Sequence, residues 1–132
     1  MTKTHQALMI YIVDDDDSVR KGLSRLMLSA GFDVSAFASA DRFLDEVCEK
    51  RRACILLDMT MPGLTGLKVQ KRLEDRGIQL PVIAVSARDD EETRQAARGL
   101  GAKFFFRKPV DDQALLDAIM WTTGSNEMTR PA

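Results

Sequence analysis

The stretch "LMIYIVDDDDSVR", Leu8 to Arg20, runs six apolar residues directly into four aspartates. An apolar run of this length, with β-branched residues and no polar alternation, predicts a strand that is covered on both faces of a sheet. A helical pattern begins at about Ser18, and Gly31 is placed to end it. A strand, an acidic turn and a helix in this order are typical of one unit of a parallel α/β sheet.

Four further strand-like segments follow, and each precedes a helical pattern. The strands are predicted at residues 33–37, 53–58, 81–87 and 103–109, and the helices at 39–50, 67–77, 89–102 and 111–121. Five alternating units at this length predict an α/β fold of the flavodoxin-like, doubly wound (βα)5 type, with parallel strand order 2-1-3-4-5. The helix at 89–102 has few apolar anchors, namely Ala96, Ala97 and Leu100, so we expect it to be weakly held.

Length and composition indicate one globular domain. The chain has 132 residues, 45% of them hydrophobic and 30% charged. We divide it into a leader at 1–7, the domain at 8–121, and a flexible tail or truncated linker at 122–132. Cys48 and Cys54 each lie in a segment predicted to contribute to the core, which favours two buried free thiols over a disulfide or metal pair.

Several classes of protein are disfavoured by the same features. A net charge of −1 with scattered Lys and Arg gives no basic stripe for a nucleic-acid backbone. The sequence has no apolar run long enough to cross a bilayer, and its start lacks a secretory cleavage site. We therefore expect a cytoplasmic protein that binds neither nucleic acid nor membrane through this domain.

Polar side chains stand where the predicted strands end. Asp14 and Asp15 follow the first strand, Asp58 ends the third, Ser86 ends the fourth, and Lys108 follows the fifth. The carboxyl ends of neighbouring parallel strands meet at one edge of the sheet, so these side chains converge if the predicted order holds. Two carboxylates about 4 Å apart repel by roughly 4 kcal/mol at an effective dielectric near 20. A cluster of oxygens without His or Cys therefore predicts a hard divalent cation, Mg²⁺ in a cell, beside the lysine.

Such a site is equipped for phosphoryl chemistry. With a metal and the Lys108 ammonium neutralising phosphoryl oxygens, the Asp58 carboxylate can act as a nucleophile toward phosphorus. The alternative is that the aspartates are turn formers and helix caps. We accept that alternative for Asp16 and Asp17, which precede the helix at Ser18 and can stabilise its positive end.

The segments "YIVDDDDSVR", "LLDMTMPGLTG", "PVIAVSAR" and "FFFRKPV" resemble the four signature segments of response-regulator receiver domains, the phosphoacceptor half of bacterial two-component signalling. The resemblance covers Leu8 to Trp121. It implies that Asp58 is the phosphorylated aspartate. It also implies that Mg²⁺ is held by Asp14, Asp15, Asp58 and the backbone carbonyl of Thr60.

The resemblance assigns further roles. Ser86 would be the switch hydroxyl, Lys108 its partner at the phosphoryl group, and Phe105 the switch aromatic that turns inward on phosphorylation. Strand alternation alone would also place some of the rings near Phe105 in the core. Thr60 and Arg88 occupy positions that tune hydrolysis of the phosphoryl group, and we hypothesise that Arg88 shields it from water.

The implied partner is a sensor histidine kinase or a phosphotransfer protein. The domain would catalyse only its own phosphorylation and dephosphorylation, so we do not class it as an enzyme. Phosphorylation would change the face made by the helix at 89–102, the strand at 103–109 and the helix at 111–121. The output is open: an unknown partner, a missing C-terminal domain or a phosphorylation-linked homodimer all fit.

Two other functions remain as alternatives. A phosphatase similar to haloacid-dehalogenase hydrolases would use Asp58 as nucleophile, but Thr60 replaces the second aspartate that such an enzyme needs as its acid. A binding module that signals without phosphate would keep the fold, although degenerate receivers usually lose one of the five site residues. The family most often has Phe where Val110 follows the Lys-Pro pair, a departure that does not touch the chemistry.

Overall fold

The computed structural model describes residues 7–88 and 90–124. Five parallel strands form one sheet in the order β2-β1-β3-β4-β5, so the predicted flavodoxin-like order is confirmed. The strands are β1 (Met9–Val13), β2 (Asp33–Phe37), β3 (Ala53–Asp58), β4 (Val82–Ser86) and β5 (Ala102–Arg107). Residues 1–6 of the leader predicted at 1–7, and residues 125–132 of the tail predicted at 122–132, lie outside the described residues.

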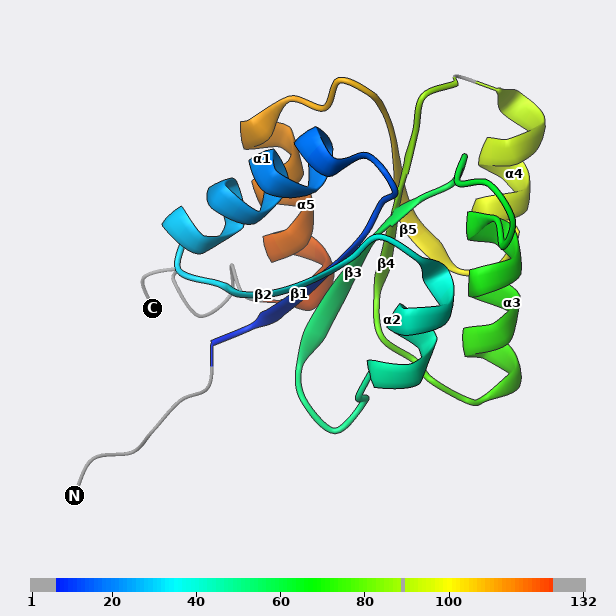
Figure 1. The fold of residues 1–132 in the computed structure, drawn as a ribbon, viewed down its shortest axis with the longest axis horizontal. Coiled ribbons are helices and arrows are strands. Elements are labelled where there is room, and N and C mark those ends of the chain that lie inside the picture. The colour runs from blue at the N-terminus through cyan, green and yellow to red at the C-terminus, as the bar shows by residue number, and fades with distance from the viewer. Residues whose placement is uncertain (1–6, 89, 125–132) are drawn as a thin grey trace.

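Five helices cover the two faces of this sheet (Figure 1). They are α1 (Asp17–Ser29), α2 (Ala40–Glu46), α3 (Gly66–Asp75), α4 (Glu91–Gly99) and α5 (Asp112–Thr123). Helices α1 and α5 lie on one face, and α2, α3 and α4 lie on the other. The connection from β1 to β2 therefore crosses one face through α1, while the next three connections cross the other face through α2, α3 and α4, as a doubly wound fold requires.

The core is divided by the alternation of side chains along the central strands. On β3, Ile55 and Leu57 pack toward α2, α3 and α4, whereas Cys54 and Leu56 pack toward α1 and α5. Each fully buried aliphatic side chain of this kind stabilises the fold by about 1.5–3 kcal/mol. Because both faces are apolar, polar groups of the central strands can lie only at their ends.

Each helix begins at a side chain that accepts a backbone N–H of the first turn. The N-cap residues are Asp16, Ser39, Thr65, Asp90 and Asp111. The predicted capping role of Asp16 is thus confirmed, while Asp17 is the first residue inside α1. An acidic residue there interacts favourably with the helix dipole.

Helix α2 is shorter than predicted. It ends at Glu46 rather than at residue 50, because Val47 adopts an extended conformation. The N–H of Cys48 then donates to the Tyr11 hydroxyl at 3.1 Å instead of to a helix carbonyl. The prediction that both thiols are buried is wrong for Cys48, which is exposed, and right for Cys54.

Helix α4 buries only one of its residues, in line with its polar sequence. Its one buried side chain is Ala97, and the Nε2 of Gln70 on α3 donates to the Ala97 carbonyl at 3.0 Å. Helix α5 continues to Thr123, two residues past the predicted end. Among residues 7–88 and 90–124, we find no helix with the length and apolar character needed to span a bilayer.

Candidate functional site

Three carboxylates converge at the carboxyl ends of β1 and β3. These strands are adjacent and pair Val13 with Leu57, so the residues that follow, Asp14 and Asp58, come side by side. Both are only 3% exposed, whereas Asp15 is exposed. One oxygen from each of the three carboxylates lies within 4.8 Å of the others. The convergence predicted from the strand ends is therefore present.

Lys108 reaches the two buried carboxylates from the end of β5. Its Nζ lies 2.8 Å from Oδ2 of Asp14 and 3.5 Å from Oδ2 of Asp58. The backbone fixes this approach, because the N–H of Lys108 donates to the Ser86 carbonyl at 2.8 Å. The ammonium therefore contacts both acids at once from a strand that neither of them belongs to.

The charges of this cluster do not balance. Burial raises the pKa of the Asp14 carboxyl, and the negative charge of Asp58 adds to this, while Lys108 and the N–H of Asp16 act in the opposite direction. Burial also disfavours the charged form of Lys108, but the two carboxylates outweigh it and raise the pKa of the ammonium. Three carboxylates against one ammonium leave an excess of negative charge that attracts a cation.

Asp58 is oriented by a turn that it makes with Thr60. Its Oδ1 accepts the backbone N–H of Thr60 at 3.0 Å and the Thr60 hydroxyl at 2.9 Å. The other oxygen, Oδ2, faces Lys108. The hydroxyl contact was not predicted, whereas an Asp side chain that accepts the backbone N–H two residues later is a common turn. The role of the Thr60 carbonyl as a metal ligand stays a prediction.

Ser86 lies next to the acidic cluster at the end of β4. Its neighbour Val85 pairs with Asp58 across the sheet, and Ser86 itself is fully buried. Its Oγ accepts the backbone N–H of Arg88 at 3.1 Å. The side chain of Arg88 is exposed, and its role in shielding the site stays a prediction.

Phe105 stands apart from its two neighbouring phenylalanines. It pairs with Ala84 and packs toward the face covered by α4, where the guanidinium of Arg94 lies 4.8 Å from the ring centroid. Phe104 and Phe106 point to the opposite face and stack on each other with centroids 6.0 Å apart. The half-buried Phe105 is thus the one ring of the three that lies on the α4 side.

The family model of the response regulator receiver domain matches residues 10–120. The chain belongs to this family. Response regulator protein TodT of Pseudomonas putida is 41% identical over 114 residues, which are 86% of this chain and 50% of TodT. Transcriptional regulatory protein FixJ of Azorhizobium caulinodans is 38% identical over 119 residues, or 90% of this chain and 56% of FixJ. The receiver chain thus spans about half the length of the curated relatives it matches.

Solved structures agree with the sequence comparison. The low-resolution structure of response regulator StyR is 38% identical, with a TM-score of 0.84 over 94% of this chain and 63% of StyR. The crystal structure of FixJ-N is 30% identical, with a TM-score of 0.83 over 91% of this chain and 96% of FixJ-N. The predicted resemblance to receiver domains of two-component signalling is therefore confirmed.

One residue near the acidic cluster of this receiver domain was not predicted from the sequence. Arg20 of α1 donates to the Asp14 carbonyl at 2.9 Å and pairs with Asp17 at 2.5 Å. Arg20 thereby connects the backbone of Asp14 to Asp17 in the first turn of α1. The only sequence signal is the three-residue spacing from Asp17, which also fits an ordinary surface ion pair.

The loop after Asp58 is packed closely against the start of α3. A Cβ at Gly66 would lie 2.6 Å from the sulfur of Met59 and 2.9 Å from the Asp58 carbonyl oxygen. Real Cβ atoms do not approach other atoms so closely, so the position requires glycine. This contact fixes the backbone on the carboxyl side of Asp58.

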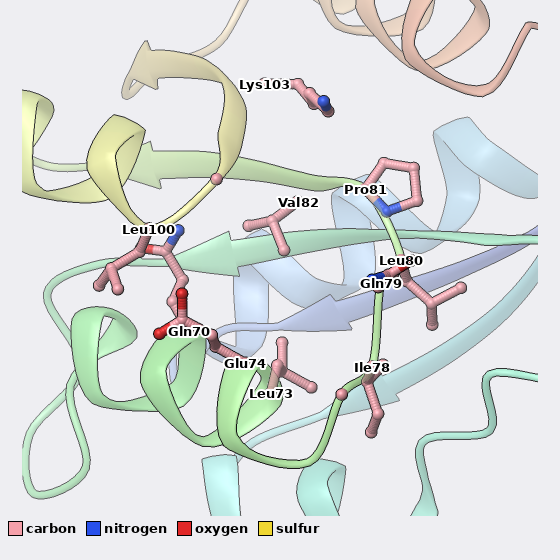
Figure 2. Close-up of a pocket in the computed structure, with 12 residues that line it drawn as sticks. Gln70, Leu73, Glu74, Ile78, Gln79, Leu80, Pro81, Val82, Leu100 and Lys103 are labelled. Carbon is pink, nitrogen blue, oxygen red and sulfur yellow. The ribbon is translucent and has the colours of Figure 1, made fainter.

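A separate surface hollow of about 290 Å³ lies at the amino ends of β4 and β5 (Figure 2). Its wall includes Gln70 and Leu73 of α3, Leu100, and Lys103 of β5. None of the predicted site residues lines it. A second hollow, of about 480 Å³, adjoins Lys108 and runs between the start of α1 and the loop before α5.

Proposed function

We propose that Asp58 accepts a phosphoryl group from the phosphohistidine of a sensor histidine kinase or a phosphotransfer protein, in a reaction that depends on Mg²⁺. The observation that carries the proposal is the approach of Lys108 to both Asp14 and Asp58 inside a cluster of three carboxylates. A structural ion pair needs one acid for one base. The additional carboxylates indicate a site built for a cation and an anionic group together.

The donor set fits Mg²⁺. Asp14, Asp15 and Asp58 offer three carboxylate oxygens within 4.8 Å of one another, with the backbone carbonyl of Thr60 as the proposed fourth ligand. These are hard oxygen ligands, which Mg²⁺ prefers, and the exposure of Asp15 leaves one side open to water. When bound, Mg²⁺ would neutralise phosphoryl oxygens and favour their approach to the acidic cluster.

Each side chain of the cluster would have a separate role in transfer of the phosphoryl group. An oxygen of the Asp58 carboxylate forms a bond to phosphorus while the bond from phosphorus to the donor imidazole nitrogen breaks, and the imidazole leaves with the bonding electron pair. Lys108 faces Asp58 Oδ2 and would pair with the phosphoryl oxygens. Thr60 holds the other oxygen, Oδ1, through two hydrogen bonds and fixes the carboxylate plane.

We further propose that phosphorylation is read through Ser86 and Phe105. The new dianionic group would draw the Ser86 hydroxyl away from the Arg88 N–H that it now accepts. The ring of Phe105 would move into the space this leaves, and the weakly anchored α4 would follow. The surface formed by α4, β5 and α5 would then change its affinity for an output domain, an output partner or a second copy.

The chain spans about half the length of the curated relatives it matches, so the identity of the output stays a proposal. We also propose a cytoplasmic location, because a sensor histidine kinase would phosphorylate the domain there.

Intact mass spectrometry tests the phosphoacceptor. The protein is incubated with acetyl phosphate, with and without Mg²⁺, as wild type, as Asp58→Asn, and as Asp45→Asn, a matched change at an exposed aspartate of α2. We expect a gain of one phosphoryl group that requires Mg²⁺ and is lost only in Asp58→Asn. The absence of any gain in the wild type would favour a domain that signals by binding alone, and multiple turnover of a phosphomonoester would favour a phosphatase.

A further inference from the structure

Arg94 of α4 covers one face of the Phe105 ring. Its guanidinium carbon lies 4.8 Å from the ring centroid, inside the range in which a cation is attracted by an aromatic face. We propose that Arg94 is a positioning residue that holds Phe105 in its half-buried place and thereby raises the threshold for the switch. This inference rests on the proposed function, because it assumes that Phe105 moves on phosphorylation.

The contact joins the two elements that the proposed switch has to move. Phe105 belongs to β5 and pairs with the buried Ala84 on the face that α4 covers. Arg94 lies in the middle of α4, one turn before Ala97, the helix's buried side chain. An interaction between Arg94 and Phe105 therefore ties the position of the ring to the position of the helix.

The contact favours one position of the ring over the other. The side chain of Arg94 is 27% exposed and lies 3.6 Å from Glu91, whose own side chain is 70% exposed. If the ring moved inward, the guanidinium would have to leave water and this carboxylate to follow it. Taking a guanidinium out of water is strongly unfavourable, so Arg94 stays at the surface and the contact is lost. The cation–π contact with Arg94 is therefore kept only while the Phe105 ring is in its half-buried position.

Among the described residues, α4 has only one buried residue to oppose such a movement. Besides Ala97, the tie between α3 and α4 is the hydrogen bond from Gln70 Nε2 to the Ala97 carbonyl. A single cation–π contact at a partly exposed site biases a two-state equilibrium by roughly two- to fivefold. In a helix so weakly anchored, a bias of this size is large enough to change how readily the site accepts its ligand.

The test measures the affinity of the domain for beryllofluoride in the presence of Mg²⁺, by calorimetry. Beryllofluoride stands in for the phosphoryl group on Asp58. Arg94→Met keeps the length of the side chain but removes the charge, and we expect it to bind about two- to fivefold more tightly than the wild type. Arg94→Lys restores a cation and should return the affinity most of the way to the wild-type value. Arg98→Met, at an exposed position of the same helix, is the matched control and should have no effect.

A second measurement separates the cation–π contact from a general loosening of α4. Phenylalanine analogues with one, two and three fluorines are placed at position 105, which weakens the negative face of the ring step by step while changing its shape little. We expect the affinity for beryllofluoride to rise with each fluorine when Arg94 is present, and to stay level in the Arg94→Met background. Equal effects in both backgrounds would overturn the inference.

The two proposals fail in different ways. If the wild type binds beryllofluoride with Mg²⁺ but Arg94→Met behaves like Arg98→Met, the role of Arg94 is refuted and the phosphoacceptor stands. If the wild type neither binds beryllofluoride nor gains a phosphoryl group from acetyl phosphate, both are refuted.

Discussion

Replacing Lys108 with methionine should destabilise the fold through its two buried carboxylate partners. The Nζ lies 2.8 Å from Asp14 and 3.5 Å from Asp58, separations at which unit charges attract by about 6 and 5 kcal/mol at an effective dielectric near 20. Desolvation offsets much of this attraction, and the lysine side chain is still 20% exposed. We therefore expect a loss of about 2–4 kcal/mol in the free energy of unfolding near neutral pH without Mg²⁺.

The loss should grow with pH. Burial already raises the pKa of Asp14 above its ordinary value of 3.8, and Lys108 opposes this, so its removal raises the pKa further. A carboxyl whose pKa is higher in the folded than in the unfolded protein costs stability as pH rises from the unfolded value through the folded one. The deficit of Lys108→Met relative to wild type should thus be small near the ordinary pKa of 3.8 and grow as the pH rises above it.

Urea unfolding followed by circular dichroism measures both effects. A loss of this size lowers the midpoint by roughly 1–3 M, because the slope for a domain of this size is about 1–3 kcal/mol per molar urea. The control is Lys71→Met, since Lys71 also contacts two carboxylates, each at 3.3 Å, but on an exposed face of α3. Exposed pairs contribute little to stability, so this variant should unfold near the wild-type midpoint. A deficit in Lys108→Met that does not change with pH, or that matches Lys71→Met, would refute the reasoning.

Three further results are expected. Gly66→Ala should lower the free energy of unfolding by about 1–3 kcal/mol, because its Cβ meets the loop after Asp58. Gly22→Ala, whose Cβ would meet no atom within 4 Å, should raise the free energy of unfolding by up to about 1 kcal/mol. Urea unfolding compares the two variants. Iodoacetamide at mildly alkaline pH should alkylate exposed Cys48 and spare Cys54, since burial raises the pKa of the Cys54 thiol to about 12. Peptide mapping that finds both cysteines labelled equally in the native protein would contradict this. Arg88→Ala should shorten the lifetime of the phosphorylated state, measured by loss of the mass gain over time, and an unchanged lifetime would remove the shielding hypothesis.

The acidic cluster was predictable because it depends on strand order more than on detail. Asp14 and Asp58 each follow an apolar run, and parallel strands bring their carboxyl ends together whatever the side chains between them do. The contact of Lys108 with both acids follows in the same way from the end of β5. Which oxygen faces which partner, and the hydrogen bonds from Thr60, depend on loop conformation and could not be predicted.

Some local predictions failed because a distant residue competed for the same group. The pattern at residues 39–50 suits a helix, yet α2 ends at Glu46, because the Tyr11 hydroxyl on β1 accepts the N–H of Cys48. That partner comes from another element and leaves no signal in the helical spacing. The same turn leaves Cys48 exposed.

The sequence by itself determined the number and order of the strands and helices, the parallel sheet, and the identity of the residues at its carboxyl edge. These features follow from hydrophobic periodicity and helix caps, which are local. Only the tertiary structure decided which side of the sheet each phenylalanine of β5 faces. The pairing with β4 shifts between Val82 and Ile83, so that Ile83 lies opposite Phe104 and Ala84 opposite Phe105. Side chains normally alternate along a strand, so the extra residue of β5 at this irregularity turns the side chains that follow it to the opposite faces. This is what places Phe105 against Arg94.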